Sequence, residues 1–197
     1  GRFNIYNTLG AIGAALNEGI SMDDAIEAVK DFQSVPGRFE LIDEGQSFAV
    51  VVDYAHTPDG LEKILGTARE ITEGKIIAVF GCGGDRDRMK RPIMGSIAAE
   101  HADISIVTSD NPRTEDPEKI IEDVVVGVEK VKKNKPDLYY EVIADRRQAI
   151  KRAVSLAKDD DIVIIAGKGH EDYQILKDRT IHFDDREEAR NALKEVK

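Results

Sequence analysis

Five short apolar runs alternate with amphipathic segments along most of this chain, and this alternation constrains the fold more than any other feature. Continuous apolar runs predict strands that are buried on both faces, and helical segments between them predict parallel neighbours. The pattern therefore predicts an α/β fold built on a doubly wound, mostly parallel sheet. The expected strands are F-A-V-V-V-D-Y (48–54), K-I-I-A-V-F-G (75–81), D-I-S-I-V-T (103–108), L-Y-Y-E-V-I (138–143) and D-I-V-I-I-A-G (161–167).

The beginning of the chain has a different texture. Small and apolar residues recur at helical spacing across residues 4–32, and the stretch N-E-G-I-S interrupts them with a glycine and a serine. This pattern predicts two short helices, the second capped by the serine. A proline and a glycine at 36–37 then break the helical pattern, so we expect a boundary that separates residues 1–35 from residues 36–197.

Charge and composition exclude several classes of protein. The 38 acidic residues outnumber the 28 basic ones, which argues against a general nucleic-acid binder, because such proteins carry an excess of Lys and Arg. No apolar stretch approaches the length of a membrane span. The single cysteine, Cys82, cannot form an internal disulfide, and no signal peptide is visible, so we expect a cytoplasmic protein. The first residue is Gly rather than Met, which suggests the C-terminal part of a longer protein.

Polar residues gather directly after four of the five expected strands. The segments are D-Y-A-H-T-P-D, G-C-G-G-D-R-D, S-D-N-P-R and G-K-G-H-E, whereas the loops before the strands resemble ordinary turns. Ligands of open parallel sheets bind outside the carboxyl ends of the strands. The asymmetry therefore predicts a binding site at this edge of the sheet.

Each of these segments also has a purely structural interpretation. G-C-G-G suits a glycine turn, and D-N-P-R suits a turn in which an Asp or Asn side chain bonds the backbone. His56 and His170 could be hydrogen-bonded structural histidines, and Met89 and Met94 could be packing residues. The occurrence of four mixed-charge segments at one edge favours a binding site over four unrelated turns.

The charges at this edge suit a ligand of both signs. Arg86 and Arg113 offer planar guanidinium groups for a carboxylate or phosphate, while Asp110 and Glu171 accept hydrogen bonds from an ammonium group. Both together suit the carboxylate and ammonium of an amino acid. Asp53 and His56 could face a different ligand, since an acid at a strand end binds ribose hydroxyls in some sheets. The phosphate-binding loop G-x-x-x-x-G-K-[ST] is absent from the sequence.

Six ordered motifs resemble the Mur ligase family: G-R-F-N-I-Y-N, V-P-G-R-F-E, D-Y-A-H-T-P-D, G-C-G-G-D-R-D-R-M-K-R-P, D-N-P-R-T-E-D-P and A-G-K-G-H-E-D-Y-Q. The resemblance runs through the whole chain. It implies that residues 1–35 are the helical end of a central ATPase domain. It also implies that residues 36–197 are a Rossmann-like C-terminal domain that binds the incoming amino acid. In this family the phosphate-binding loop lies upstream, which accounts for its absence.

The resemblance also implies roles for particular residues. D-N-P-R marks family members that add meso-diaminopimelate rather than L-lysine. The distal end of diaminopimelate is a zwitterion, whereas that of lysine is only an ammonium, which would leave Arg113 unpaired or repelled. The implied diaminopimelate contacts are Arg86, Asp110, Asn111, Pro112, Arg113, Gly167 and Glu171, and the implied ATP contacts are Asn7, Arg38, Asp53 and His56.

The implied reaction is the ATP-dependent formation of an amide in peptidoglycan synthesis. ATP phosphorylates the terminal carboxylate of UDP-N-acetylmuramoyl-L-Ala-D-Glu, and the amine of diaminopimelate attacks the acyl phosphate. The resemblance implies ATP and Mg²⁺ as cofactors, with the phosphate and metal ligands in upstream domains and no metal site in this chain. These 197 residues would position the amine and be inactive alone. Three alternatives stay open: an L-lysine-adding ligase, another Mur or folylpolyglutamate-type ligase, and a non-catalytic amino-acid-binding module.

Overall fold

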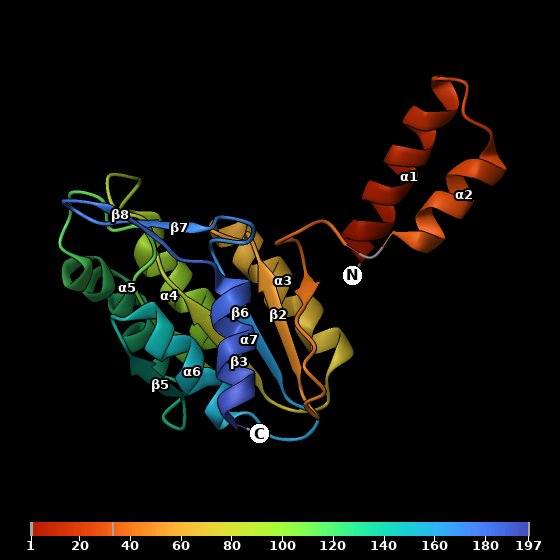
Figure 1. Ribbon diagram of the computed structural model, residues 1–197. Coiled ribbons are helices and arrows are strands. Elements are labelled where there is room, and N and C mark those ends of the chain that lie inside the picture. The colour runs from red at the N-terminus through yellow and green to blue at the C-terminus, as the bar shows by residue number, and fades with distance from the viewer. Residues whose placement is uncertain (1, 33, 197) are drawn as a thin grey trace. The chain divides into compact units, whose positions relative to one another are not determined.

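The computed structural model describes residues 2–32 and 34–196 and divides the chain into two compact units (Figure 1). The first unit comprises Gly1–Val35 and the second comprises Pro36–Lys197. None of the helices in the described residues has the length and apolar content needed to cross a lipid bilayer.

The first unit is a pair of helices, as the sequence predicts. α1 (Arg2–Asn17) and α2 (Met22–Asp31) pack against each other and are joined through Gly19, which has a φ of 85°. The predicted serine cap is confirmed, because Ser21 Oγ accepts a hydrogen bond of 3.1 Å from the Asp24 backbone N–H. Most apolar side chains of this helix pair are exposed, and Ala25 is its buried hydrophobic residue among those described.

The second unit is built on a six-stranded sheet that confirms the predicted α/β fold class. All five predicted strands form, and a short strand is added at one edge. The order across the sheet is β1-β2-β6-β3-β4-β5, with β1 antiparallel to β2 and every other pair parallel. The bounds are β1 (Glu40–Leu41), β2 (Ala49–Asp53), β3 (Ile76–Phe80), β4 (Ile104–Val107), β5 (Tyr139–Val142) and β6 (Ile162–Ala166).

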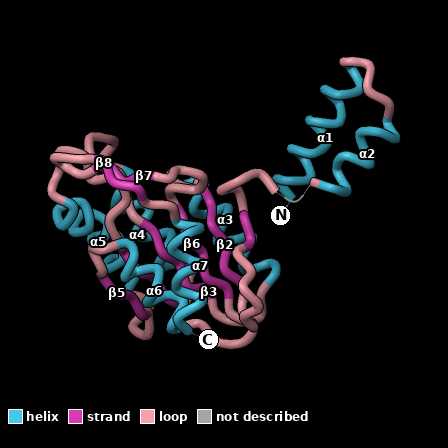
Figure 2. Tube along the Cα trace, viewed as in Figure 1, coloured by secondary structure: helices cyan, strands magenta, loops and turns pink. Residues whose placement is uncertain are grey.

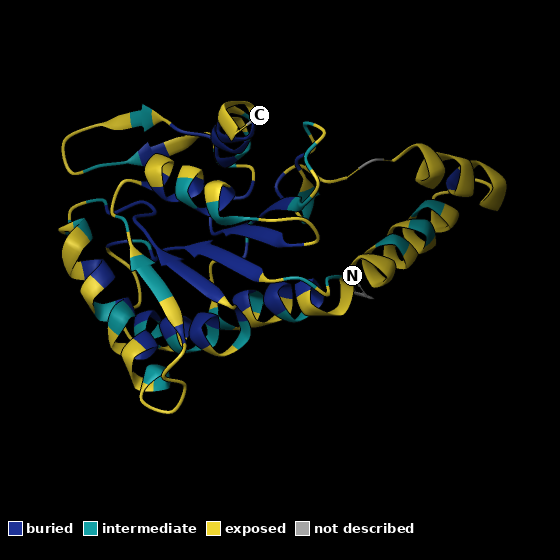
Figure 3. Cartoon of the chain, turned by 90° about the horizontal axis from the view of Figure 1, so that it is seen from below, coloured by how far each residue is buried: buried dark blue, intermediate teal, exposed yellow. Residues whose placement is uncertain are grey.

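Helices cover both faces of this sheet and create two separate cores. One core joins alternate strand residues to α3 (Pro58–Ile71), α4 (Lys90–His101) and α5 (Pro117–Lys132). The other joins the intervening strand residues to α6 (Arg146–Leu156) and α7 (Asp185–Val196). The central strands lie between these layers and are buried along their length (Figure 3). Burial on both faces explains why these central strands read as continuous apolar runs rather than as alternating ones. The prediction of burial on both faces is wrong for β5, an edge strand in which Tyr139 and Val142 are exposed.

The position of β6 decides which loops become neighbours. β6 is the last parallel strand in the sequence, yet it lies between β2 and β3. The segment after β6 therefore lies between the segments that follow β2 and β3. Because all these strands are parallel, their carboxyl ends share one edge of the sheet, where the connecting loops gather (Figure 2).

A hairpin that the sequence patterns did not indicate follows the loop after β6. It consists of β7 (Tyr173–Ile175) and β8 (Thr180–His182), which pair antiparallel. Gln174 Nε2 donates to the Asp110 carbonyl oxygen at 2.7 Å, and the Arg113 N–H donates to the Ile175 carbonyl oxygen at 3.1 Å. The hairpin thereby fixes the backbone of the D-N-P-R segment from one side.

The start of the second unit is anchored to the same loop. Gly37 is buried with a φ of 69°, and a Cβ built on it would lie 2.1 Å from the His170 backbone nitrogen. Gly169, with a φ of 54°, leaves equally little room, because its Cβ would lie 2.7 Å from the Gly37 carbonyl oxygen. Only glycine fits such a close approach of two backbones. Gly37 is therefore fixed to the loop after β6 and belongs to the second unit.

Candidate functional site

The segments after β3 and β4 are joined by backbone and side-chain hydrogen bonds. The Gly84 N–H donates to the Asn111 carbonyl oxygen at 2.9 Å, and Arg113 Nη1 donates to the Gly84 carbonyl oxygen, also at 2.9 Å. A Cβ on Gly84 would lie 1.9 Å from the carbonyl oxygen of Pro112, which is buried. The glycines of G-C-G-G thus let the D-N-P-R backbone come close.

Arg113 combines a strained backbone with an available guanidinium edge. Its φ is 53°, a conformation that a residue with a Cβ adopts only when its surroundings impose it. Nη1 bonds the carbonyl oxygens of Gly84 and Asn111. Within the described part of the chain, Nε and Nη2 make no hydrogen bond. These two donors form one side of the guanidinium fork and match a carboxylate.

Asn111 and Glu171 are in direct contact. Asn111 Nδ2 donates to Glu171 Oε2 at 3.0 Å, and the buried ammonium of Lys168 donates to Asn111 Oδ1 at 3.2 Å and to Glu171 Oε2 at 3.4 Å. The Ile175 N–H also donates to Asn111 Oδ1 at 2.9 Å. The loops after β4 and β6 are therefore joined by side chains, and Glu171, which is half-buried, brings a carboxylate to this group.

Asp110 lies beside Gly167 at the carboxyl ends of β4 and β6. Asp110 Oδ1 accepts a hydrogen bond of 2.6 Å from the Asn111 N–H, and a Cβ on Gly167 would lie 2.7 Å from Asp110 Oδ2. Gly167 has a φ of 125°, so both its conformation and the nearby carboxylate require glycine.

A buried ion pair lies beneath these two residues. Arg146 Nε and Nη2 each donate to the Asp185 carboxylate at 2.7 Å, and both side chains are fully buried. Arg146 Nη2 also donates to the Ala166 carbonyl oxygen at 3.0 Å, which attaches the pair to the end of β6. Burial disfavours the charged form of Arg146, but Asp185, Asp110 and Glu171 together raise its pKa.

Arg86 lies close to this group of residues. It is exposed, and no hydrogen bond or ion pair joins its guanidinium to another residue of the described ranges. A Cβ on Gly83 would lie 2.8 Å from Arg113 Nη1 and 3.8 Å from Arg86 Cγ, so the two arginines flank one glycine. All seven residues that the sequence assigns to the amino acid thus lie in one region; whether they bind it stays a prediction.

Three of the four residues assigned to ATP lie in the second unit, around Tyr54 and the end of β2. Arg38 lies over the Tyr54 ring at 4.6 Å, and the rings of His56 and His170 lie 4.6 and 5.4 Å from the same ring. Asp53 is buried, and its two oxygens accept hydrogen bonds of 2.8 Å from the Phe39 and Ala55 N–H groups. Burial raises the pKa of Asp53, although these bonds and Arg38 oppose the rise. The Asp53 carboxylate therefore fixes the backbone at Phe39 and Ala55.

The fourth residue assigned to ATP lies in the other unit. Asn7 belongs to α1 of the first unit. The predicted grouping of Asn7 with Arg38, Asp53 and His56 therefore remains a prediction, whereas these three residues lie together in the second unit.

The sequence patterns did not indicate a network of ion pairs that joins the loops after β3 and β4. Arg91, of which 1% is exposed, donates from Nη2 to Glu115 Oε1 at 2.8 Å and from Nη1 to Asp123 Oδ2 at 2.9 Å. Glu115 Oε1 also accepts a bond of 2.6 Å from the Asp85 N–H, so Glu115 links the segments after β3 and β4. Hydrogen bonding from Arg91, then from Asp85, lowers the pKa of Glu115 to about 2. Arg91 lies in the motif G-C-G-G-D-R-D-R-M-K-R-P and Glu115 in D-N-P-R-T-E-D-P. Their membership of these motifs was the sequence feature that could have indicated their importance.

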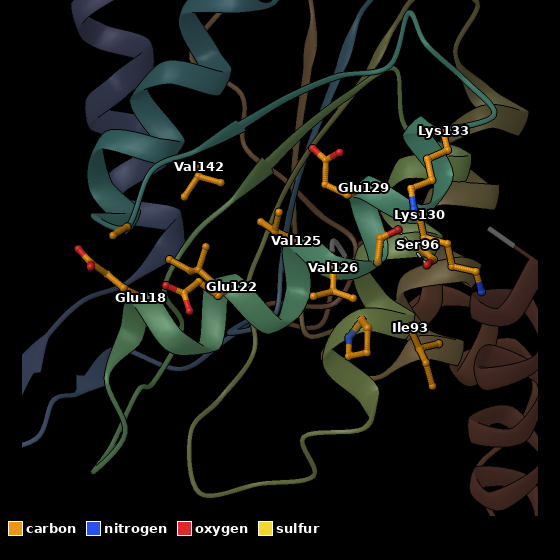
Figure 4. A pocket seen from close by; sticks show the side chains of 14 residues that line it. Ile93, Ser96, Glu118, Glu122, Val125, Val126, Glu129, Lys130, Lys133 and Val142 are labelled. Atoms are coloured by element: carbon orange, nitrogen blue, oxygen red, sulfur yellow. Dashed lines mark hydrogen bonds between the residues drawn. The ribbon is translucent and has the colours of Figure 1, made fainter.

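An apolar groove lies elsewhere on the second unit. It has a volume of about 1170 Å³ and is lined by residues of α4, α5 and the end of β5, among them Ile93, Val125, Val126 and Val142 (Figure 4). None of the candidate site residues lines it. Nor do the described residues contain a group of three or more His, Cys, Asp or Glu side chains arranged to hold a metal ion.

Comparison with known proteins identifies the family. A sequence profile described as "Mur ligase, glutamate ligase domain" matches residues 37–169, which is more than half of the chain. The chain belongs to the Mur ligase family. This confirms the resemblance that the six motifs carry.

Individual Mur ligases match the chain from end to end. It is 56% identical, over 100% of its length, to the "UDP-N-acetylmuramoyl-L-alanyl-D-glutamate--2,6-diaminopimelate ligase" of Clostridium botulinum, and 55% identical to the Syntrophomonas wolfei protein of that name over 98%. A solved structure with the same name covers 99% of the chain with 42% identity and a TM-score of 0.76. The chain spans 40%, 39% and 39% of these three Mur ligases.

Proposed function

We propose that this chain is the amino-acid-binding part of a longer Mur ligase that joins meso-diaminopimelate to UDP-N-acetylmuramoyl-L-Ala-D-Glu. The observation that carries the proposal is the juxtaposition of Arg113 with Asn111 and Glu171. Arg113 Nη1 donates to the Asn111 carbonyl oxygen at 3.3 Å, and Asn111 Nδ2 donates to Glu171 at 3.0 Å. A guanidinium edge that makes no hydrogen bond to the described residues and a carboxylate thus both lie next to one asparagine.

The chemistry of this pair suits the distal end of diaminopimelate. Arg113 Nε and Nη2 can bind its carboxylate as a fork, while Glu171 can accept from its ammonium group. L-Lysine has no distal carboxylate, so binding it would leave the Arg113 fork unpaired beside an ammonium of like charge. Leaving a polar group unpaired in a binding site costs enough to discriminate strongly between two such substrates. The identity to relatives named for diaminopimelate addition supports the same choice.

In the proposed reaction, ATP phosphorylates the terminal carboxylate of the UDP-linked dipeptide and ADP leaves. The nitrogen lone pair of the amino acid then attacks the acyl carbon, the C–O bond to phosphate breaks, and the nitrogen loses a proton. The described residues of this chain contribute position: they hold the distal zwitterion so that the reacting amine points away from the clamp. Such positioning raises the effective concentration of the amine without acid or base chemistry.

The fit of the other ligands differs. Arg38, Tyr54, His56 and His170 form an aromatic and cationic cluster that suits stacking with a nucleotide base, so we assign the base of ATP to them. For Mg²⁺ the described residues do not fit, since they hold no suitable cluster of ligands. We assign the metal and phosphate contacts to parts of the ligase outside these residues, and we place the reaction in the bacterial cytoplasm.

The decisive experiment is a ligation assay of the full-length protein with a panel of amino acids. We expect amide formation that requires ATP and the UDP-linked dipeptide, with meso-diaminopimelate used far better than L-lysine. Preference for L-lysine would overturn the substrate assignment, and binding of an amino acid without any ATP-dependent product would indicate a binding module. The 197-residue chain alone is expected to give no product.

A further inference from the structure

Lys168 is a fully buried lysine to which neither the amino acid nor ATP is assigned. It follows Gly167 at the carboxyl end of β6, and its side chain has 0% exposure. Its ammonium donates to Asn111 Oδ1 at 3.2 Å and to Glu171 Oε2 at 3.4 Å, and it lies 5.5 Å from the centre of the Tyr173 ring. Both hydrogen-bond partners are residues that we assign to the amino acid.

Burying an ammonium group is costly unless its charge is compensated. Removal from water costs several kcal/mol or more, which a carboxylate and well-placed acceptors offset. The compensation for Lys168 comes from the Glu171 carboxylate, the Asn111 amide oxygen and the face of Tyr173. A hydrophobic residue at this position would avoid the cost altogether, so the benefit of Lys168 must lie in what it does to its partners.

The first effect of Lys168 is on the orientation of the Asn111 side chain. Asn111 Oδ1 accepts from both Lys168 Nζ and the Ile175 N–H, at 3.2 and 2.9 Å. Two donors on one side define which end of the amide carries oxygen. The amide nitrogen must then face Glu171, where it donates at 3.0 Å.

The second effect is on Glu171. Both Asn111 Nδ2 and Lys168 Nζ point to the same carboxylate oxygen, Oε2. Oε1 makes no hydrogen bond to any residue within the described ranges, so it is the oxygen that is left for a ligand. The Glu171 N–H donates to the Lys168 carbonyl oxygen at 2.9 Å, which closes the turn between these two residues.

We propose that Lys168 is a positioning residue for the incoming amino acid, acting through Asn111 and Glu171. Its buried ammonium holds Oε2 and the amide in one arrangement, so that Oε1 is presented to the ammonium group of the substrate. This inference rests on the proposed function, and it adds a residue that does not itself touch the substrate.

The test is Lys168→Met in the full-length protein, because Met keeps the length and burial of the side chain while removing the charge and the donors. We expect the KM for meso-diaminopimelate to rise about tenfold or more, as for a lost buried charged hydrogen bond. The KM for ATP should change by less than about threefold. Lys135→Met is the control, since Lys135 is exposed and its Nζ donates to the Ala99 carbonyl oxygen at 3.4 Å, away from the site. It should change neither constant.

A second comparison separates positioning from general damage. If Lys168 acts through Glu171, then adding Lys168→Met to Glu171→Gln should raise the KM for diaminopimelate much less than Lys168→Met does alone. Independent, multiplying effects of the two substitutions would overturn the proposal.

The remaining outcomes are also decisive. Wild-type protein that does not use diaminopimelate would overturn the proposed function. Wild-type protein that uses it, with an unchanged KM in Lys168→Met, would overturn this inference alone. If Lys168→Met reduces the folded fraction measured by circular dichroism, Lys168→Gln, which is polar but also removes the charge, takes its place with the same expectations. Unfolding of both variants would overturn the inference by assigning Lys168 to stability.

Discussion

Asn111 and Glu171 are 60 residues apart in the sequence, yet a hydrogen bond of 3.0 Å joins Asn111 Nδ2 to Glu171 Oε2. This contact exists because β6 lies beside β3 and near β4 in the sheet, although β6 comes last among the parallel strands. The Asn111 backbone carbonyl is at the same time held by Gly84 and Arg113. One asparagine therefore connects three loops, and substitutions in any of them are expected to reach the same site.

Replacing Arg113 tests the clamp directly. Arg113→Gly removes the guanidinium and also relieves the backbone strain, since glycine adopts a φ of 53° without cost. We expect the KM for meso-diaminopimelate to rise on the order of 100-fold, because a charge-assisted pair in a binding site is lost, with little change in the KM for ATP. Steady-state kinetics of the full-length protein measures both constants. Arg179→Ala, at an exposed arginine, is the control, and an equal loss for both substrates would indicate structural collapse.

Gly167→Ala and Gly66→Ala form a matched pair. A Cβ at Gly167 meets Asp110 Oδ2 at 2.7 Å on a backbone with a φ of 125°, whereas a Cβ at Gly66 in α3 meets nothing within 4 Å. We expect Gly167→Ala to lower the free energy of unfolding by about 1–3 kcal/mol and to weaken use of the amino acid. Gly66→Ala should raise it by about 0.5–1 kcal/mol. Urea denaturation measures the free energy of unfolding of both variants. Similar changes for the two would contradict the conclusion that Gly167 must be glycine.

The Arg91–Glu115 network predicts a dependence of stability on pH. Because the pKa of Glu115 falls from 4.5 to about 2 on folding, its ionised form stabilises the protein above about pH 4.5. That contribution is lost as the pH falls from about 4.5 towards about 2. The gap in unfolding free energy between wild type and Glu115→Gln should therefore narrow over this range in urea denaturation. The exposed Glu122 supplies the control Glu122→Gln, and a constant gap for Glu115→Gln would refute the role of its charge.

The buried pair of Arg146 and Asp185 predicts a large loss on breaking one side. Asp185→Asn leaves a guanidinium fully buried without its counter-ion, so the free energy of unfolding should fall by about 3–5 kcal/mol. Replacing both partners with apolar residues, as in Arg146→Met with Asp185→Leu, should recover much of that loss. Thermal and urea denaturation measure these effects. Asp178→Asn, at an exposed ion pair, should stay within about 0.5 kcal/mol, and an equally small effect of Asp185→Asn would show that the pair is dispensable.

Local patterns predicted the main fold well because strands that are buried on both faces read as continuous apolar runs in the sequence. Each continuous apolar run became a parallel strand, and the polar segments after them met at one edge. The two-residue strand β1 and the hairpin of β7 and β8 left no comparable mark, since their short, partly exposed strands carry mixed side chains. The insertion of β6 between β2 and β3 is decided by packing across the whole sheet, which no local window contains.

The candidate site shows the same division. The charges of Arg113 and Glu171 are visible in the sequence, and so is their position after strands. The burial of Lys168, in a loop, and of Arg91, at the start of α4, is not visible, because charged residues in polar segments are usually exposed and only tertiary contacts reverse this. Asp53 illustrates the converse, since a strand-end acid that suggests a ligand contact holds the Phe39 and Ala55 N–H groups.

The close packing of Gly37 on Gly169 and His170 has a practical consequence for work with the second unit by itself. The Gly37 backbone packs against the loop that leads to Glu171, and a Cβ built on it would lie only 2.1 Å from the His170 backbone nitrogen. A shortened polypeptide that starts at Phe39 would lack both the packing of Gly37 on this loop and the Arg38 guanidinium over the Tyr54 ring. An isolated amino-acid-binding unit should therefore begin at Pro36 or earlier, because its first two or three residues are part of the wall that supports the site.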